Sequence, residues 1–172
     1  MQRGNNMATF TWYNGEVPNG LKVRQVYGLI FTRDGRMLLK VENKSRGKVY
    51  SLAGGTPETF DVDKEATLRR ELIEEVNVTI EKPITVGYQE VDEENGTPTY
   101  AQFRMTAIID NIGPCLPDPD NGETYERLLT TPSRAIELIG WGEVGKLQIE
   151  EAFRIAKDEL GLTTFSDKEE YI

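Results

Sequence analysis

Glu71, Glu74 and Glu75 are the residues best suited to chemistry in this sequence, and they follow Arg70 closely. An α-helix turns roughly 100° per residue, so these three carboxylates would share one face of a helix. Like charges three or four residues apart destabilise a helix by about 0.2–0.5 kcal/mol per pair. Clustered carboxylates become favourable around a hard cation such as Mg²⁺, which takes oxygen ligands and keeps waters for a phosphate substrate. The alternative is an ordinary helix with a solvated acidic face.

The surrounding stretch predicts a loop that leads into a helix. Residues 63–76 contain good helix formers, acids in the first turn and no internal glycine or proline. The side opposite the glutamates would pack on a sheet and carries the apolar residues Ala66, Leu72, Ile73 and Val76. Before the loop, Gly54 and Gly55 allow a tight turn.

Gly55 to Val78 resembles the signature sequence of the Nudix hydrolases, Gly-x5-Glu-x7-Arg-Glu-(aliphatic)-x-Glu-Glu-x-Gly-(aliphatic). Residues 70–75 reproduce its helical half, and Gly55 matches its first glycine. The sequence departs from the pattern in the loop, where Asp61 replaces a glutamate and one extra residue precedes Arg70. Asn77 replaces the closing glycine, and asparagine is the commonest non-glycine residue with the left-handed backbone that ends many helices.

The resemblance implies an α/β fold of the Nudix type, an α/β/α sandwich around a mixed β-sheet. It also implies a Mg²⁺-dependent enzyme, with Mn²⁺ as an alternative metal. Glu71, Glu74, Glu75 and the carbonyl of Gly54 would bind the metal, and Arg70 would orient the glutamates.

The base that activates water is predicted either on this helix, with Glu71 and Glu74 as catalytic residues, or in a downstream loop. Residues 112–125 form the longest predicted loop, which contains three prolines and Glu123, and Glu126 lies just beyond it. Long, proline-stiffened loops in compact domains are often functional. For each of these two loop glutamates, a solvated surface acid is the alternative.

The remaining elements predict a sheet with two further helices. Strands are expected over residues 22–32, 37–41, 48–52, 84–92 and 99–110, and helices from Thr131 to Gly140 and over residues 147–160. In residues 99–110 apolar side chains alternate with Gln102, Arg104 and Thr106. Arg104 is a candidate for holding a phosphate, with an exposed arginine on the sheet as the favoured alternative.

Length and composition favour one domain over residues 1–172, with 1–8 and 166–172 as loose ends. The formal charge of −9 argues against a nucleic-acid polymer as partner, and the absence of histidine excludes a histidine base. Cys115 is the single cysteine, which excludes an internal disulfide and a cysteine-rich zinc site. No apolar run has membrane length and no signal-peptide pattern begins the sequence, so we expect no membrane contact and a cytoplasmic location.

The resemblance implies hydrolysis of a phosphoanhydride bond in a small nucleotide. ADP-ribose-like nucleotide sugars and nucleoside triphosphates stay equally open as substrates, and homodimers are common in the family. The alternative is a catalytically inactive Nudix module that binds a nucleotide or a partner, supported by the loop departures. An isopentenyl diphosphate isomerase is less favoured, because Cys115 lies in the long loop and not in a strand before the signature.

Overall fold

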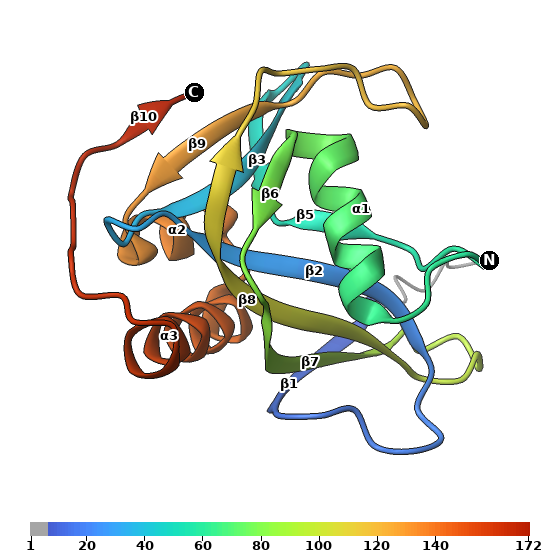
Figure 1. Cartoon of the computed structure of the whole chain (residues 1–172). Helices are drawn as coiled ribbons and strands as arrows, with labels where there is room; N and C mark the ends of the chain where they lie inside the picture. The colour runs from blue at the N-terminus through green and yellow to red at the C-terminus, as the bar shows by residue number, and fades with distance from the viewer. Residues whose placement is uncertain (1–6) are drawn as a thin grey trace.

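A computed structural model describes residues 7–172, and in that part of the chain ten strands and three helices form layers (Figure 1). The helices are α1 (Lys64–Val76), α2 (Pro132–Ile139) and α3 (Gly142–Glu159). The strands are β1 (Thr9–Asn14), β2 (Val23–Phe31), β3 (Met37–Lys44), β4 (Gly47–Ser51), β5 (Ala53–Gly55), β6 (Val78–Ile80), β7 (Ile84–Asp92), β8 (Tyr100–Ile112), β9 (Glu126–Thr130) and β10 (Glu170–Tyr171).

The sheet is mixed and runs in the order β1-β7-β8-β2-β3-β9-β10. β2 and β8 pair in parallel, whereas β7 and β8 form an antiparallel hairpin. Helix α1 packs on β5, β2 and β6, while α3 packs on β1, β7 and β8 from the opposite face (Figure 1). The arrangement is the α/β/α sandwich expected from the sequence.

The middle of the sheet is forked. β2 and β3 pair where Phe31 meets Met37. Farther along β2, Val26 to Gly28 pair with β5 instead, and β3 takes β4 and β9 as its neighbours. Two half-sheets therefore separate beyond the short β2–β3 ladder, which leaves space between them.

Two apolar cores lie on opposite faces of the sheet. The core under α1 includes Leu68, Leu72 and Phe103, and the core under α2 and α3 includes Phe31 and Ile149. The predicted alternation of β8 is confirmed, since its apolar side chains lie in the α1 core. The favoured reading of Arg104 as an exposed arginine is wrong, because α3 covers that face of β8 and leaves the side chain about 1% exposed. The prediction that Ile73 packs on the sheet is also wrong, because its side chain is about 50% exposed.

The C-terminal end differs from the expectation of a loose tail. Residues 1–6 lie outside the described part, and Met7 is exposed. The predicted loose tail at 166–172 is wrong, because β10 pairs antiparallel with the edge strand β9. Arg36 Nη1 donates to Glu170 Oε1 at 2.7 Å, and the backbone N–H of Ile172 donates to the carbonyl of Arg127 at 2.9 Å. These contacts fix the tail against the sheet.

The sequence prediction lacked four of the short strands, β1, β6, β9 and β10, and began one helix too late. The first turn-rich segment contains β1, which pairs with β7. Helix α3 begins at Gly142, one turn before the predicted start. None of the helices over residues 7–172 is long and apolar enough to span a bilayer.

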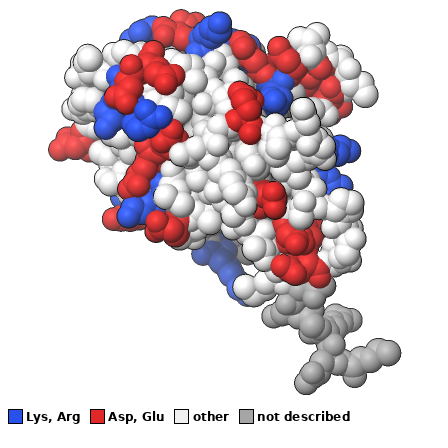
Figure 2. Space-filling view, turned by 90° about the horizontal axis from the view of Figure 1, so that it is seen from below, with Lys and Arg blue, Asp and Glu red and all other residues white. Residues whose placement is uncertain are grey.

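The surface charge is mixed where it can be followed in Figure 2. Acidic side chains gather in several groups with basic side chains between them, and no continuous basic stripe crosses this described face (Figure 2). Binding of a nucleic-acid backbone requires such a stripe.

Candidate functional site

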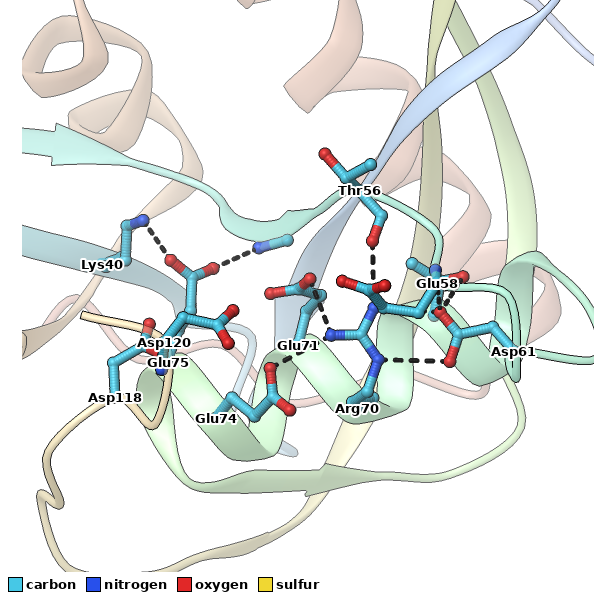
Figure 3. Close-up of polar contacts among 12 residues, drawn as sticks. Lys40, Thr56, Glu58, Asp61, Arg70, Glu71, Glu74, Glu75, Asp118 and Asp120 are labelled. Atoms are coloured by element: carbon cyan, nitrogen blue, oxygen red, sulfur yellow. Dashed lines mark hydrogen bonds and ion pairs between the residues drawn. The ribbon is translucent and has the colours of Figure 1, made fainter. Parts of the chain in front are cut away.

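Helix α1 presents the glutamates as predicted. The Asp63 side chain accepts a hydrogen bond from the Ala66 N–H at 2.8 Å and so begins the helix, which ends at Asn77 in a left-handed conformation (φ 50°). Glu71 and Glu75 are buried, and the Glu74 side chain is about 22% exposed. All three carboxylates lie along the same side of α1 (Figure 3).

The glycine pair in β5 is required by close contacts. A Cβ atom on Gly55 would lie 2.4 Å from Glu71 Oε1, so glycine lets that carboxylate lie directly against the strand. A Cβ atom on Gly54 would lie 2.2 Å from the carbonyl oxygen of Val26 in β2. The N–H of Gly54 donates to Glu75 Oε1 at 2.7 Å. This contact brings Gly54 to the carboxylates, while the metal-binding role of its carbonyl stays a prediction.

Arg70 connects the helix to the loop before it (Figure 3). Its Nη1 donates to Glu71 Oε1 at 2.9 Å and to Glu74 Oε2 at 3.1 Å. Its Nε and Nη2 donate to the two oxygens of Asp61 at 3.1 and 2.9 Å, and Nη2 also reaches the carbonyl of Thr56 at 3.0 Å. Arg70 is therefore placed to orient two of the glutamates.

Asp61, which stands in place of the glutamate of the pattern, is bound by Arg70, by a backbone N–H of its own loop and by Thr67 of α1. Its Oδ2 accepts from the Glu58 N–H and from Thr67 Oγ1, both at 2.9 Å. The hydrogen bonds from Arg70, together with these donors, hold the pKa of Asp61 well below its ordinary value. The shorter side chain and the extra loop residue thus still deliver a charged carboxylate to Arg70.

Lys40 is a site residue that the sequence did not reveal. It lies on β3 and its Nζ donates to Glu75 Oε2, so the buried carboxylate is ion-paired (Figure 3). Burial raises the pKa of Glu75 from its ordinary value, and the ion pair with Lys40 opposes this shift. Burial also raises the pKa of Glu71 to about 7, against the hydrogen bond from Arg70.

The carboxylates suit a divalent cation by their chemistry. In residues 7–172 no group of three or more His, Cys, Asp or Glu side chains is arranged to hold a metal ion, and Arg70 and Lys40 contact the glutamates instead. A single nitrogen of Arg70 is shared between Glu71 and Glu74, so positive charge is already favoured between these two carboxylates. The donors are carboxylate oxygens, the ligands that Mg²⁺ prefers, and burial of Glu71 makes a neighbouring cation favourable. The ligand types present therefore fit a Mg²⁺ site. Arg70 would give up part of its contacts with the glutamates when the metal binds.

The roles of Glu123 and Glu126 as bases stay predictions. The Glu126 carboxylate accepts hydrogen bonds from Asn43 Nδ2 at 3.0 Å and from Lys48. Glu126 pairs with Val41 in the β3–β9 ladder, and the side chain of Val41 belongs to the core under α2 and α3. Glu123 is exposed in the loop. The carbonyl of Glu123 accepts from the backbone N–H of Asp118 at 2.7 Å, so Glu123 belongs to the same turn as Asp118.

Asp118 is the loop acid beside the glutamates. Its side chain is buried, it lies next to Glu75 in Figure 3, and its charge contributes to the raised pKa of Glu75. Its Oδ1 accepts from the backbone N–H of Asp120 at 2.8 Å. The Asp-Pro-Asp turn was visible in the sequence, but nothing local distinguishes Asp118 from the other loop acids.

A cavity of about 680 Å³ opens in the fork of the sheet. Tyr27, Ser51, Arg104 and Trp141 line it, and so does Lys40, which also contacts Glu75. The cavity and the carboxylates therefore adjoin each other through Lys40. A molecule in this cavity could extend one end towards α1.

The fold is found in solved structures of low sequence identity. A NUDIX hydrolase from Nitrosomonas europaea is 19% identical, with a TM-score of 0.56 over 83% of this chain and 93% of the other. A Listeria monocytogenes protein assigned as a NUDIX hydrolase is 17% identical, with a TM-score of 0.58 over 80% of this chain and 96% of the other. The Bacillus subtilis pyrophosphohydrolase BsRppH is 18% identical, with a TM-score of 0.51 over 62% of this chain and 63% of the other.

No protein-family model and no curated protein matches the sequence. This chain spans less than two thirds of the length of BsRppH, and nearly all of the other two proteins. The chain has the Nudix fold, as the resemblance of residues 55–78 implied. The α/β/α class predicted from the sequence is confirmed.

Proposed function

We propose that the chain hydrolyses a phosphoanhydride bond in a small nucleotide, in a reaction that depends on Mg²⁺. The observation that carries this proposal is the junction at Lys40, where the carboxylates of α1 adjoin a cavity large enough for a nucleoside. The Nudix fold and the signature residues on α1 support it further. The substrate would be a nucleoside diphosphate linked to another group, of the ADP-ribose or nucleotide-sugar type, or a nucleoside triphosphate.

The residues of α1 would carry the chemistry of this reaction. Glu71, Glu74, Glu75 and the carbonyl of Gly54 would hold Mg²⁺ or Mn²⁺, which when bound would neutralise phosphate oxygens. Arg70 keeps two of the carboxylates in place through the hydrogen bonds described above. Glu71 and Glu74 are the proposed bases on the helix.

Asp118 is our proposed base from the loop, in place of Glu123 and Glu126. A general base must come within hydrogen-bond reach of the water that it deprotonates. Asp118 lies beside Glu75, whereas Glu126 is bound to Lys48 and Asn43. Glu126 would have to release these partners to act.

The test is release of phosphate or monophosphate from a panel of nucleoside diphosphate and triphosphate derivatives, with and without Mg²⁺. We expect Glu74→Gln and Glu75→Gln to lower kcat at least about a hundredfold while the proteins stay folded, because an oxygen ligand of the metal is lost. Glu126→Gln is the matched control and should keep nearly full activity. Normal activity in both α1 variants would remove the metal assignment.

A binding module without catalysis is the alternative outcome of this panel. It would appear as no cleavage of any compound together with a calorimetric signal for Mg²⁺ or nucleotide. We further propose a cytoplasmic protein and a homodimer. Light scattering of the purified chain tests the dimer.

A further inference from the structure

The cavity contains buried polar atoms that lack a partner. Within residues 7–172, Arg104 Nη1 and Ser51 Oγ are both buried without a hydrogen bond, and both residues line the cavity. An unsatisfied buried donor costs about 1–3 kcal/mol, and more if it is charged. Such a cost indicates a group that is satisfied when a ligand binds.

A chain of neutral amides holds the Arg104 side chain in place. Its Nε donates to Gln148 Oε1 at 2.8 Å, and Gln148 Nε2 donates to Gln89 Oε1 at 3.0 Å. Gln89 donates in turn to Gln102 at 2.8 Å, and Gln102 to Gln25 at 2.6 Å. The amides fix the direction of the guanidinium without neutralising its charge.

The charge of Arg104 has no carboxylate partner among the described residues. Burial lowers its pKa to about 10, so the group is still a cation at neutral pH. The guanidinium carbon lies 4.7 Å from the ring centre of Tyr27 and 5.9 Å from that of Trp141. The cavity therefore combines a cationic donor with two aromatic side chains.

These features favour a flat ring with an accepting edge. An arginine donates well to two neighbouring acceptors, such as O6 and N7 of guanine, whereas adenine presents an amino donor beside N7. A free phosphate would use the charge and leave the aromatic side chains without a role. The neutral amides around Arg104 also supply no counter-charge, which keeps its remaining N–H groups available for acceptors.

We propose that Arg104 is a specificity residue that binds the 6-oxo edge of a purine in this cavity, with Ser51 as a further donor. The inference rests on the proposed function, since it names the base of the nucleotide that would be cleaved. The base would lie in the fork of the sheet, and its phosphates would extend past Lys40 to α1.

The test compares two nucleosides that differ at the purine 6-position, inosine with a 6-oxo group and adenosine with a 6-amino group. Calorimetry in EDTA measures their binding without any hydrolysis, and ribose 5-phosphate serves as the anionic probe. We expect inosine to bind at least about tenfold more tightly than adenosine. Arg104→Gln should remove this difference. Arg24→Gln, an exposed arginine that stacks on Tyr100 and does not line this cavity, is the matched control.

Trp141→Ala gives a second variant at the exposed mouth of the cavity, where folding is not at risk. This variant should bind both nucleosides more weakly. Equal affinities for inosine and adenosine would overturn the inference, and so would ribose 5-phosphate binding that depends on Arg104. If Arg104→Gln fails to fold, an unchanged inosine preference in Ser51→Ala would overturn it, because Ser51 is the second proposed donor to the base. Selective binding of inosine without cleavage of any nucleotide would support this inference and contradict the proposed hydrolase. Cleavage without a preference between the two bases would support the hydrolase and contradict this inference.

Discussion

At the scale of residues, Arg70 explains how an altered signature loop can keep its geometry. Aspartate has one methylene less than the glutamate of the pattern, yet both Asp61 oxygens are bound by Arg70 at 2.9–3.1 Å. The same guanidinium reaches Glu71 and Glu74. The loop acid therefore contributes through Arg70 to the position of the carboxylates, and the departures from the pattern do not separate loop and helix.

Asp61→Asn should lower the free energy of unfolding at pH 7 by about 2 kcal/mol, because hydrogen bonds to a charged partner are lost. Arg70 depresses the pKa of Asp61, so this stability is present above the ordinary pKa of an unfolded aspartate, about 3.9, and is lost as the pH falls below it. Urea denaturation at pH 7 and pH 3 measures both effects, with Asp167→Asn on an exposed segment as the control. An equal difference from wild type at the two pH values would contradict the ionic role of Asp61.

At the scale of elements, the end of α1 shows what asparagine adds over the glycine of the pattern. Asn77 adopts φ 50° and ends the helix, and its Nδ2 donates to the carbonyl of Pro114 at 2.9 Å. Gly113 packs against the Asn77 side chain, and Arg127 Nη1 donates to the carbonyls of Val76 and Gly113 at 2.8 and 2.6 Å. These contacts fasten the long loop that carries Asp118 to the helix that carries the glutamates.

Asn77→Ala should therefore lower the free energy of unfolding by about 2 kcal/mol, since it adds left-handed strain to the loss of the Pro114 hydrogen bond. Asn77→Gly keeps the left-handed conformation and should cost about 1 kcal/mol. Urea denaturation checks the order of the two variants, and Asn19→Ala in an exposed turn is the control. If the glycine variant loses as much free energy of unfolding as the alanine variant, the left-handed backbone conformation is not the main source of the stability that Asn77 contributes.

At the scale of the whole molecule, the fork of the sheet joins two different environments. One side holds buried carboxylates on α1, and the other holds the cavity, whose lining includes Arg104, two aromatic side chains and also Glu42. The chain carries a net charge of −9, so a divalent cation at α1 would relieve repulsion where acids are concentrated. Binding of such a cation to the folded chain alone would stabilise it by linkage.

A hundredfold excess of Mg²⁺ over its dissociation constant should stabilise the fold by about 2.7 kcal/mol, which corresponds to a rise in Tm of at least about 5 °C. EDTA should reverse the rise, and Mn²⁺ should replace Mg²⁺. Thermal unfolding followed by circular dichroism measures the shift. The double variant Glu74→Gln, Glu75→Gln should lose it, whereas Glu126→Gln should retain it. A shift of equal size in the double variant would place the cation elsewhere.

Short-range patterns determined much of this protein from the sequence alone. The glutamates share a face because helical periodicity is a local property, and Asp63 and Asn77 mark the helix ends by their own backbone and side-chain preferences. The β7–β8 hairpin and the start of α2 at Thr131 follow from turn and capping residues in the same way. The glycine pair was also visible, although its contact with Glu71 was not.

Only the tertiary structure decided which distant residues meet these local elements. Lys40 is 35 residues from Glu75, and Gln148 is 44 residues from Arg104, so neither contact has a periodic trace in the sequence. Arg104 alternates with apolar residues as an exposed side chain would, and it is buried only because α3 covers that face of β8. Burial and long-range pairing depend on how whole elements pack. That packing creates the cavity, brings Asp118 to Glu75 and pairs Glu126 with Lys48.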